Sequence, residues 1–413
     1  MQLSRSFVVL FAVLVLALPA TAAPGDLDTT FSADGMVLVD NDVGDEAGGL
    51  ALQGDGKILQ AGETGLPGVD DFMVVRYTRD GVPDSTFGGD GIVTTDFFGA
   101  DDYATGVISL PGNKTLAVGY GRPSGGVYEF ALAQYNANGT PDGSFGGDGK
   151  VTTPFPGHGY AYAALRLTDG SIVVVGERYE GHGDFALAKY RPNGALDTSF
   201  SGDGKRTLDF AGGSDGAVDI VAAGDRLLLS GWGMDGPSPN DYDIALARFK
   251  RGGALDRQFS GDGKRLLSLG AGSQDYADGL VRLGDGRFVV AAGLGGGDVA
   301  LAKFKPGGGL DGTFGGGDGK ALVDFGANET VSGLARVARG YAVGVRQSNQ
   351  MGGARFGPRG SPIGSFGTGG LALAAFANQS FVTGVANQDG KMVTGGFAFT
   401  GTSNDFAVAR FLT

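Results

Sequence analysis

Residues 25–35 read GDLDTTFSADG, and the same segment returns six more times along this chain of 413 residues. The later copies read GVPDSTFGGDG, GTPDGSFGGDG, GALDTSFSGDG, GALDRQFSGDG, GLDGTFGGGDG and, much altered, GSPIGSFGTGG. Their phenylalanines, at intervals of 52 to 59 residues, are Phe31, Phe87, Phe145, Phe200, Phe259, Phe314 and Phe366. A unit of this length, written seven times, indicates tandem supersecondary repeats around a shared core.

Each repeat reads as four short strands. In the third copy we predict strands over residues 160–167, 171–176, 184–190 and 205–210, with a glycine-containing turn at 168–170. The continuous Ile-Val-Val-Val run of the second strand is typical of a strand that is covered on both faces. Apolar content falls from the first strand to the fourth, as expected for a blade that runs from the inside of a propeller to its outside.

Seven such units predict an all-β fold, a seven-bladed β-propeller of four-stranded blades formed by residues 24–413 as a single domain. After an N-terminal leader the chain opens with a fourth-strand segment, 35–40, and it closes with a third-strand segment, 405–411. Pairing these two would close the ring and remove both free sheet edges. The sixth copy and its linker at Ile363 depart most from the pattern.

The linker, the turn with its second strand, and the third strand together resemble the bacterial delta-60 repeat. The resemblance rests on segments such as GALDTSFSGDG, LQGDGKILQAG and DFALAKY, and it covers residues 27–411. It implies a propeller-like repeat array in an exported bacterial protein. The family brings no catalytic residues that could be carried over to this chain.

The N-terminus predicts a signal peptide over residues 1–23. Arg5 precedes an apolar run over 7–18 and a small-residue stretch over 19–23, and this run is too short to span a bilayer. We therefore expect a secreted or periplasmic protein with no membrane span after the signal is removed. We also expect it to be a monomer.

Composition excludes several classes of function. The chain has 45 acidic and 32 basic residues and a net charge of −13, which argues against nucleic acid as a partner. It contains no cysteine and two histidines, so disulfides, thiol chemistry and cysteine-type zinc sites are ruled out.

Two sets of carboxylates recur at equivalent positions of the repeats. Six linker aspartates, three positions before the phenylalanine, are predicted to cap backbone N–H groups of the turn. A second set stands before the first strand of five copies: Asp45, Asp102, Asp215, Asp275 and Glu329. We interpret these as caps of their own loops, and the alternative is a metal site that takes Ca²⁺ as its cofactor.

The connections between second and third strands differ most among the copies, and they predict the functional face. Their aromatic and histidine residues are the candidate ligand-binding residues: Tyr128, His158, Tyr179, His182, Trp232 and Tyr242. Trp232 is expected in the longest of these loops. The favoured function is an exported, non-catalytic binding or scaffold propeller for an extracellular glycan, peptide or protein. The alternative is an extracellular hydrolase or lyase that uses His158, His182 and a nearby carboxylate.

Overall fold

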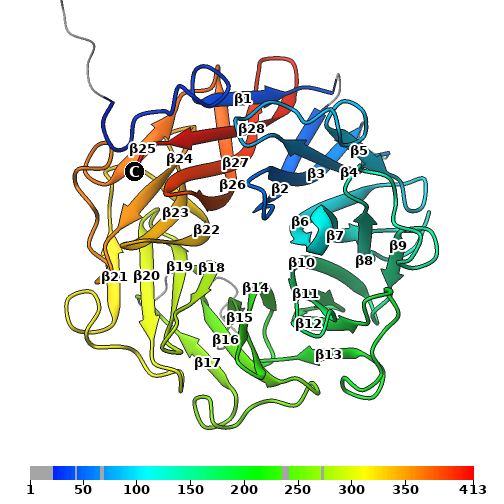
Figure 1. Cartoon of the computed structure of the whole chain (residues 1–413). Coiled ribbons are helices and arrows are strands. Elements are labelled where there is room, and N and C mark those ends of the chain that lie inside the picture. The colour runs from blue at the N-terminus through cyan, green and yellow to red at the C-terminus, as the bar shows by residue number, and fades with distance from the viewer. Residues whose placement is uncertain (1–21, 42–43, 66–68, 235–240, 271–273) are drawn as a thin grey trace, which may run out of the picture.

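The computed structural model describes residues 22–41, 44–65, 69–234, 241–270 and 274–413. Within these ranges the chain forms seven four-stranded antiparallel sheets around a central axis, and its one helical element is the 3₁₀ turn η1 (Pro111–Asn113) (Figure 1). The predicted seven-bladed propeller is confirmed. The predicted signal peptide falls almost wholly outside the described residues.

In blades 1 to 6 the strands follow one another from the propeller axis outwards in the order of the sequence, and in blade 7 the N-terminal strand takes the outer place. Blade 1 contains β2 (Gly44–Leu52), β3 (Ile58–Gly65), β4 (Asp71–Tyr77) and β5 (Ile92–Thr95). Blade 2 contains β6 (Asp102–Leu110), β7 (Lys114–Gly121), β8 (Glu129–Tyr135) and β9 (Lys150–Thr153). Blade 3 contains β10 (His158–Arg166), β11 (Ile172–Tyr179), β12 (Gly183–Tyr190) and β13 (Lys205–Leu208). Blade 4 contains β14 (Asp215–Ala223), β15 (Arg226–Met234), β16 (Tyr242–Lys250) and β17 (Lys264–Leu267).

The remaining blades keep the same plan. Blade 5 contains β18 (Asp275–Arg282), β19 (Phe288–Leu294), β20 (Val299–Phe304) and β21 (Lys320–Val323). Blade 6 contains β22 (Glu329–Val337), β23 (Gly340–Gln347), β24 (Gln350–Phe356) and β25 (Leu371–Ala374). Blade 7 contains β26 (Gln379–Gln388), β27 (Lys391–Phe399), β28 (Asn404–Phe411) and the N-terminal strand β1 (Met36–Val39). No helix among the described residues is long and apolar enough to cross a membrane.

The two ends of the chain close the ring. Strand β1 pairs antiparallel with β28, with Met36 opposite Ala409 and Val39 opposite Phe406. Figure 1 shows blue β1 lying beside red β28. The N-terminal segment therefore supplies the outer strand of the last blade, as the repeat phase predicted.

The linkers between third and fourth strands hold neighbouring blades together. All seven linker phenylalanines are buried, with at most 1 % of their surface exposed. The residue after each phenylalanine donates its N–H to a carbonyl of the next linker, as from Ser32 to Asp80 at 2.8 Å. The seventh of these bonds runs from Gly367 to Pro24 at 2.9 Å and completes the circle.

The linker aspartates cap their turns, as predicted. Asp28 accepts hydrogen bonds from the backbone N–H and the hydroxyl of Thr30. Its second oxygen accepts from Arg410 at 2.7 Å and from Lys391 at 2.6 Å, an ion pair that the sequence analysis missed. Burial alone would raise the pKa of Asp28, but the bonds from Lys391 and Thr30 and the charge of Arg410 lower it to about 2.

Blade 6 folds without this ion pair. Ile363 stands where the other linkers have aspartate, and Arg355 occupies the position that Arg410 holds in blade 7. Arg355 is 8 % exposed, and its Nε and Nη1 have no hydrogen-bond partner among the described residues. All four strands of the blade form nevertheless, so the altered copy keeps the fold and loses one interaction.

Removal of β1 tests ring closure. A chain that begins at residue 41 would leave the edge of β28 unpaired. It would also leave the buried Arg410 without its partner Asp28. We expect it to melt at a lower temperature than a chain that begins at residue 24, or to aggregate. Equal melting temperatures in differential scanning calorimetry would show that closure does not stabilise the ring.

The substitution Ile363→Asp tests the linker ion pair. A carboxylate at this position would meet the unpaired Arg355 and should raise the free energy of unfolding by roughly 1 to 3 kcal/mol. Urea denaturation of both proteins measures the difference. Ile363→Asn, which can cap the turn but carries no charge, is the matched control and should give a smaller gain.

Candidate functional site

Two kinds of connection meet at one end of the propeller, which we call the loop end. They are the loops between second and third strands and the loops that lead into each first strand. The N–H of Asp102 donates to Asp70 O at 2.6 Å, and that of Gly159 donates to Tyr128 O at 2.8 Å. The two kinds of connection therefore share one face of the propeller.

The five predicted metal residues act first as caps of their loops. Each lies at or beside the start of a first strand, is at most 3 % exposed, and accepts a backbone N–H from the incoming loop. The donors are Asn41 for Asp45, Phe97 for Asp102, Phe210 for Asp215, Leu269 for Asp275 and Ala327 for Glu329. The capping interpretation is thus confirmed.

Three of these caps also belong to separate groups of carboxylates between neighbouring blades. In each group, one oxygen from every member lies within 4.8 Å of the others. The groups are Asp71, Asp96 and Asp102; Asp184, Asp209 and Asp215; and Asp298, Asp324 and Glu329. Burial raises the pKa of Asp102 and of Asp215 to about 7 and that of Asp45 to about 6.

A group of rings lies between blades 2 and 3 at the loop end, and we call it the tyrosine cluster. Its members are Tyr103, Tyr120, Tyr128, His158 and Tyr160. Ring centroids of Tyr120 lie 5.2 Å from those of Tyr103 and Tyr128 and 5.0 Å from that of Tyr160. All five rings are half-buried, so each keeps an accessible part. Edge-to-face contacts of this kind hold the rings in fixed orientations.

Carboxylates border the tyrosine cluster. Burial, together with the charges of Glu46, Asp70 and Asp101, raises the pKa of Glu63 to about 8. One cation also lies here, because the Arg122 guanidinium sits 5.2 Å from the centroid of Tyr128 and pairs with Asp101 at 3.0 Å. The surroundings of the rings are therefore polar and mainly acidic.

Trp232 does not lie in a loop, and this corrects the sequence-based placement. It belongs to β15, opposite Gly216 of β14. A Cβ atom at Gly216 would stand 2.6 Å from the indole, so the ring rests on glycine backbone. With Tyr242 at 5.3 Å and Tyr276 at 6.4 Å it forms a second half-buried set of rings, which we call the tryptophan group. The loop predicted to carry it spans residues 232–242, of which 235–240 lie outside the described residues.

A central cavity of about 480 Å³ runs beside the tryptophan group. Each first strand carries a β-bulge at the same place, and the bulged residues line the cavity. They are Gly48, Thr105, Tyr162, Val218, Asp278, Gly333 and Thr383. Burial raises the pKa of Asp278 to about 7 and that of neighbouring Asp219 to about 6.

The other predicted ligand-binding residues lie at the loop end but have separate partners. His158 begins β10, and its Nδ1 accepts the N–H of Tyr128 at 3.3 Å. His182 lies before β12, with Nε2 3.7 Å from Asp184. Tyr179 ends β11 and is 42 % exposed. The structure thus brings Tyr128 and His158 together, and Trp232 and Tyr242 together, in different blades.

Four of the eight ring positions were not among the predicted ligand-binding residues. Tyr103, Tyr160 and Tyr276 each stand two residues before a bulge, and Tyr120 and Trp232 pair with such positions across the sheet. The available signal was an aromatic residue directly before the alanine of a first strand, as in Tyr103-Ala104 and Tyr160-Ala161.

The substitution Asp278→Asn tests the acid in the cavity. A carboxyl group whose folded-state pKa is raised costs stability when it ionises, so stability should fall as pH rises from about 4 to about 7. The isosteric amide avoids this loss, and we expect it to gain roughly 1 to 3 kcal/mol near pH 8 and almost nothing near pH 4. Urea denaturation at both pH values measures the gain. Asp262→Asn, at an exposed turn, should be neutral at both; a gain at Asp278 independent of pH would contradict the assignment.

Comparison with known proteins agrees with the fold. A family model described as "Domain of unknown function (DUF5122) beta-propeller" matches residues 53–87, 111–145, 167–200 and 388–413. No curated protein matches the chain. Among solved structures, the polysaccharide lyase Uly1 is similar with a TM-score of 0.50 at 11 % identity, over 91 % of this chain and 98 % of that one.

Two further structures have lower scores. An α-L-arabinanase of Penicillium chrysogenum, complexed with arabinobiose, gives a TM-score of 0.44 at 10 % identity, over 74 % of this chain and 91 % of that one. Sqt1 of Chaetomium thermophilum, bound to the N-terminus of a ribosomal protein, gives 0.47 at 11 % identity, over 91 % and 98 %. The likeness to Uly1, at 11 % identity, is one of fold alone. The chain is thus similar to a β-propeller repeat family.

Proposed function

We propose that the protein is an exported, non-catalytic β-propeller of the delta-60 repeat type that binds a neutral polysaccharide at its loop end. The observation that carries the proposal is the tyrosine cluster. Its rings offer flat apolar surface with polar edges, which suits stacking on the faces of sugar rings. Because the rings brace one another, little side-chain freedom would be lost on binding.

Charge favours an uncharged ligand. Asp70 and Asp101 lie beside the cluster, and the chain as a whole carries a net charge of −13. A polymer of uronic acids would meet repulsion there, whereas neutral hydroxyl groups can donate hydrogen bonds to the carboxylates. The tryptophan group, two blades further along the ring, would supply a second contact for a long chain.

Binding fits the contacts better than hydrolysis or lysis does. The two histidines that would serve as acid and base have separate partners, Tyr128 N–H for one and Asp184 for the other. Catalysis needs its groups arranged around one reacting atom. A binding surface requires only rings that are partly accessible and polar neighbours, which the cluster has.

Titration of the chain from residue 24 with neutral and uronate polysaccharides, followed by calorimetry, tests the proposal. We expect binding to a neutral polymer, and Tyr128→Ala should weaken it by about 1 to 3 kcal/mol with little change in melting temperature. Tyr128→Phe keeps the ring and should bind nearly as well. Trp232→Ala should weaken binding too, with some loss of stability because its ring covers Gly216.

The matched control is Leu322→Ala, which removes an apolar side chain that is 51 % exposed on outer strand β21. It should leave binding unchanged. Equal binding by wild type and Tyr128→Ala would refute the site. Shortening of the polymer, detected as new reducing ends or as unsaturated products, would favour the hydrolase or lyase instead.

A further inference from the structure

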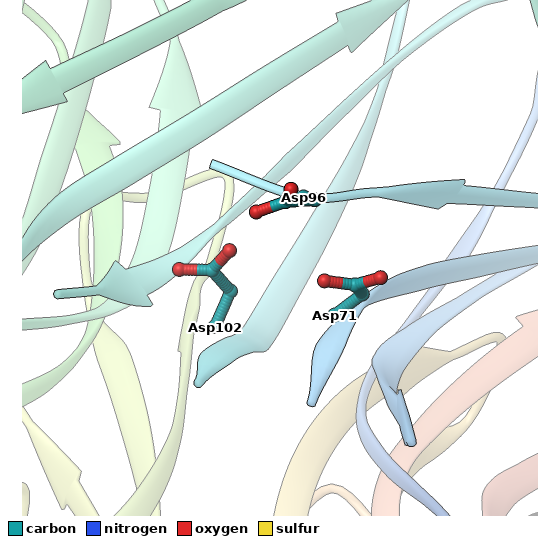
Figure 2. A group of neighbouring side chains, drawn as sticks. All are labelled: Asp71, Asp96 and Asp102. Carbon is teal, nitrogen blue, oxygen red and sulfur yellow. The ribbon is translucent and has the colours of Figure 1, made fainter. Parts of the chain in front are cut away.

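The carboxylates of Asp71, Asp96 and Asp102, which we call the first carboxylate cluster, meet at the junction of blades 1 and 2. Asp71 begins β4, Asp96 follows β5 and Asp102 begins β6. Figure 2 shows the three carboxyl groups gathered around one space. An oxygen from each lies within 4.8 Å of the other two, close enough for all three to bind one ion.

Backbone hydrogen bonds fix this arrangement. One Asp96 oxygen accepts the N–H of Gly99, and Asp102 Oδ2 accepts the N–H of Phe97 at 2.7 Å. The N–H of Asp102 in turn donates to Asp70 O at 2.6 Å, which ties β6 to the residue before Asp71. The carboxylates are therefore held close together by the loop itself.

One oxygen of the cluster is left without a partner. Asp102 is fully buried, and its Oδ1 accepts no hydrogen bond. Gly121 leaves the space for this oxygen, because a Cβ atom there would stand 2.1 Å from it. A buried carboxylate oxygen without a partner costs free energy, and a cation bound by the cluster would offset that cost.

The other two carboxylate groups are partly compensated by protein atoms. Arg178 pairs with Asp184 at 2.8 Å in the second group, and Gln347 donates to Glu329 at 2.8 Å in the third. Among the described residues, the first cluster has no ion pair of this kind. Lys150 is nearby, but its Nζ bonds the carbonyl oxygen of Asp96 at 3.0 Å.

We propose that the first carboxylate cluster binds a divalent cation, with Ca²⁺ as the ion it fits best. Ca²⁺ takes six to eight oxygen ligands in flexible geometry, and three carboxylates with water would provide them. Asp96 is exposed, so ions and water can reach the cluster from solvent. The bound ion would neutralise the mutual repulsion of the carboxylates and link blade 1 to blade 2.

Chelator-treated protein beginning at residue 24, titrated with CaCl₂ alone and with MgCl₂ alone, tests this proposal without any sugar. We expect Ca²⁺ to raise the melting temperature by ~2 °C for each tenfold increase above the dissociation constant. The substitution Asp71→Asn should remove one bound Ca²⁺ per chain in calorimetric titration and reduce this rise. In chelator it should melt higher than wild type, because one repelling charge is gone.

The control is Asp203→Asn, which removes the same charge at an exposed turn of blade 3. It should keep the wild-type calcium stoichiometry. The proposal is overturned if millimolar Ca²⁺ leaves the wild type unchanged, or if Asp71→Asn binds as many ions as wild type. A response to Mg²⁺ equal to that to Ca²⁺ would overturn the choice of ion.

Discussion

The hydrogen bond from one linker to the next is the constraint on which the ring depends. Each linker phenylalanine is buried, and the residue after it binds the linker of the following blade. Because the seventh such bond runs from Gly367 to Pro24, the first and last copies constrain each other. Each such bond contributes about 0.5 to 1.5 kcal/mol to the free energy of unfolding, so the ring is most stable when every bond is made.

This constraint divides the molecule into two ends with different freedom. At the linker end every blade needs the same turn, the same buried ring and, in six of seven copies, the same aspartate. At the loop end the repeated side chain is the carboxylate that caps the start of the first strand in five blades. The side chains that differ from blade to blade, such as Tyr120, Glu177 and Trp232, therefore gather at the loop end. A binding surface can be built there without disturbing the ring.

The sequence predicted those features that repeat. The number of blades, the four strands and the closing strand follow from repeat length, turn glycines and the phase of the termini. The position of Trp232 could not be predicted in this way, because its flanking glycines suggested a loop. In the structure these glycines permit close approach of strands: a Cβ at Gly231 would stand 1.9 Å from Gly216 O, and one at Gly233 would stand 2.6 Å from Asp215. These glycines are required by close packing of strands, and from the sequence alone they cannot be distinguished from glycines of a turn.

The carboxylate groups and the tyrosine cluster were beyond sequence analysis for a related reason. Their members come from segments that meet only when two blades are docked, as Asp71 and Asp102 do. Asp102 and Tyr103 are adjacent in sequence, yet one faces a carboxylate cluster and the other an aromatic cluster, because successive strand residues point to opposite faces. The loop end thus combines carboxylates that accept hydrogen bonds from backbone N–H groups with aromatic rings that pack against one another. A charged polymer of the same sign is disfavoured at such a surface, and the rings that remain accessible suit an uncharged one.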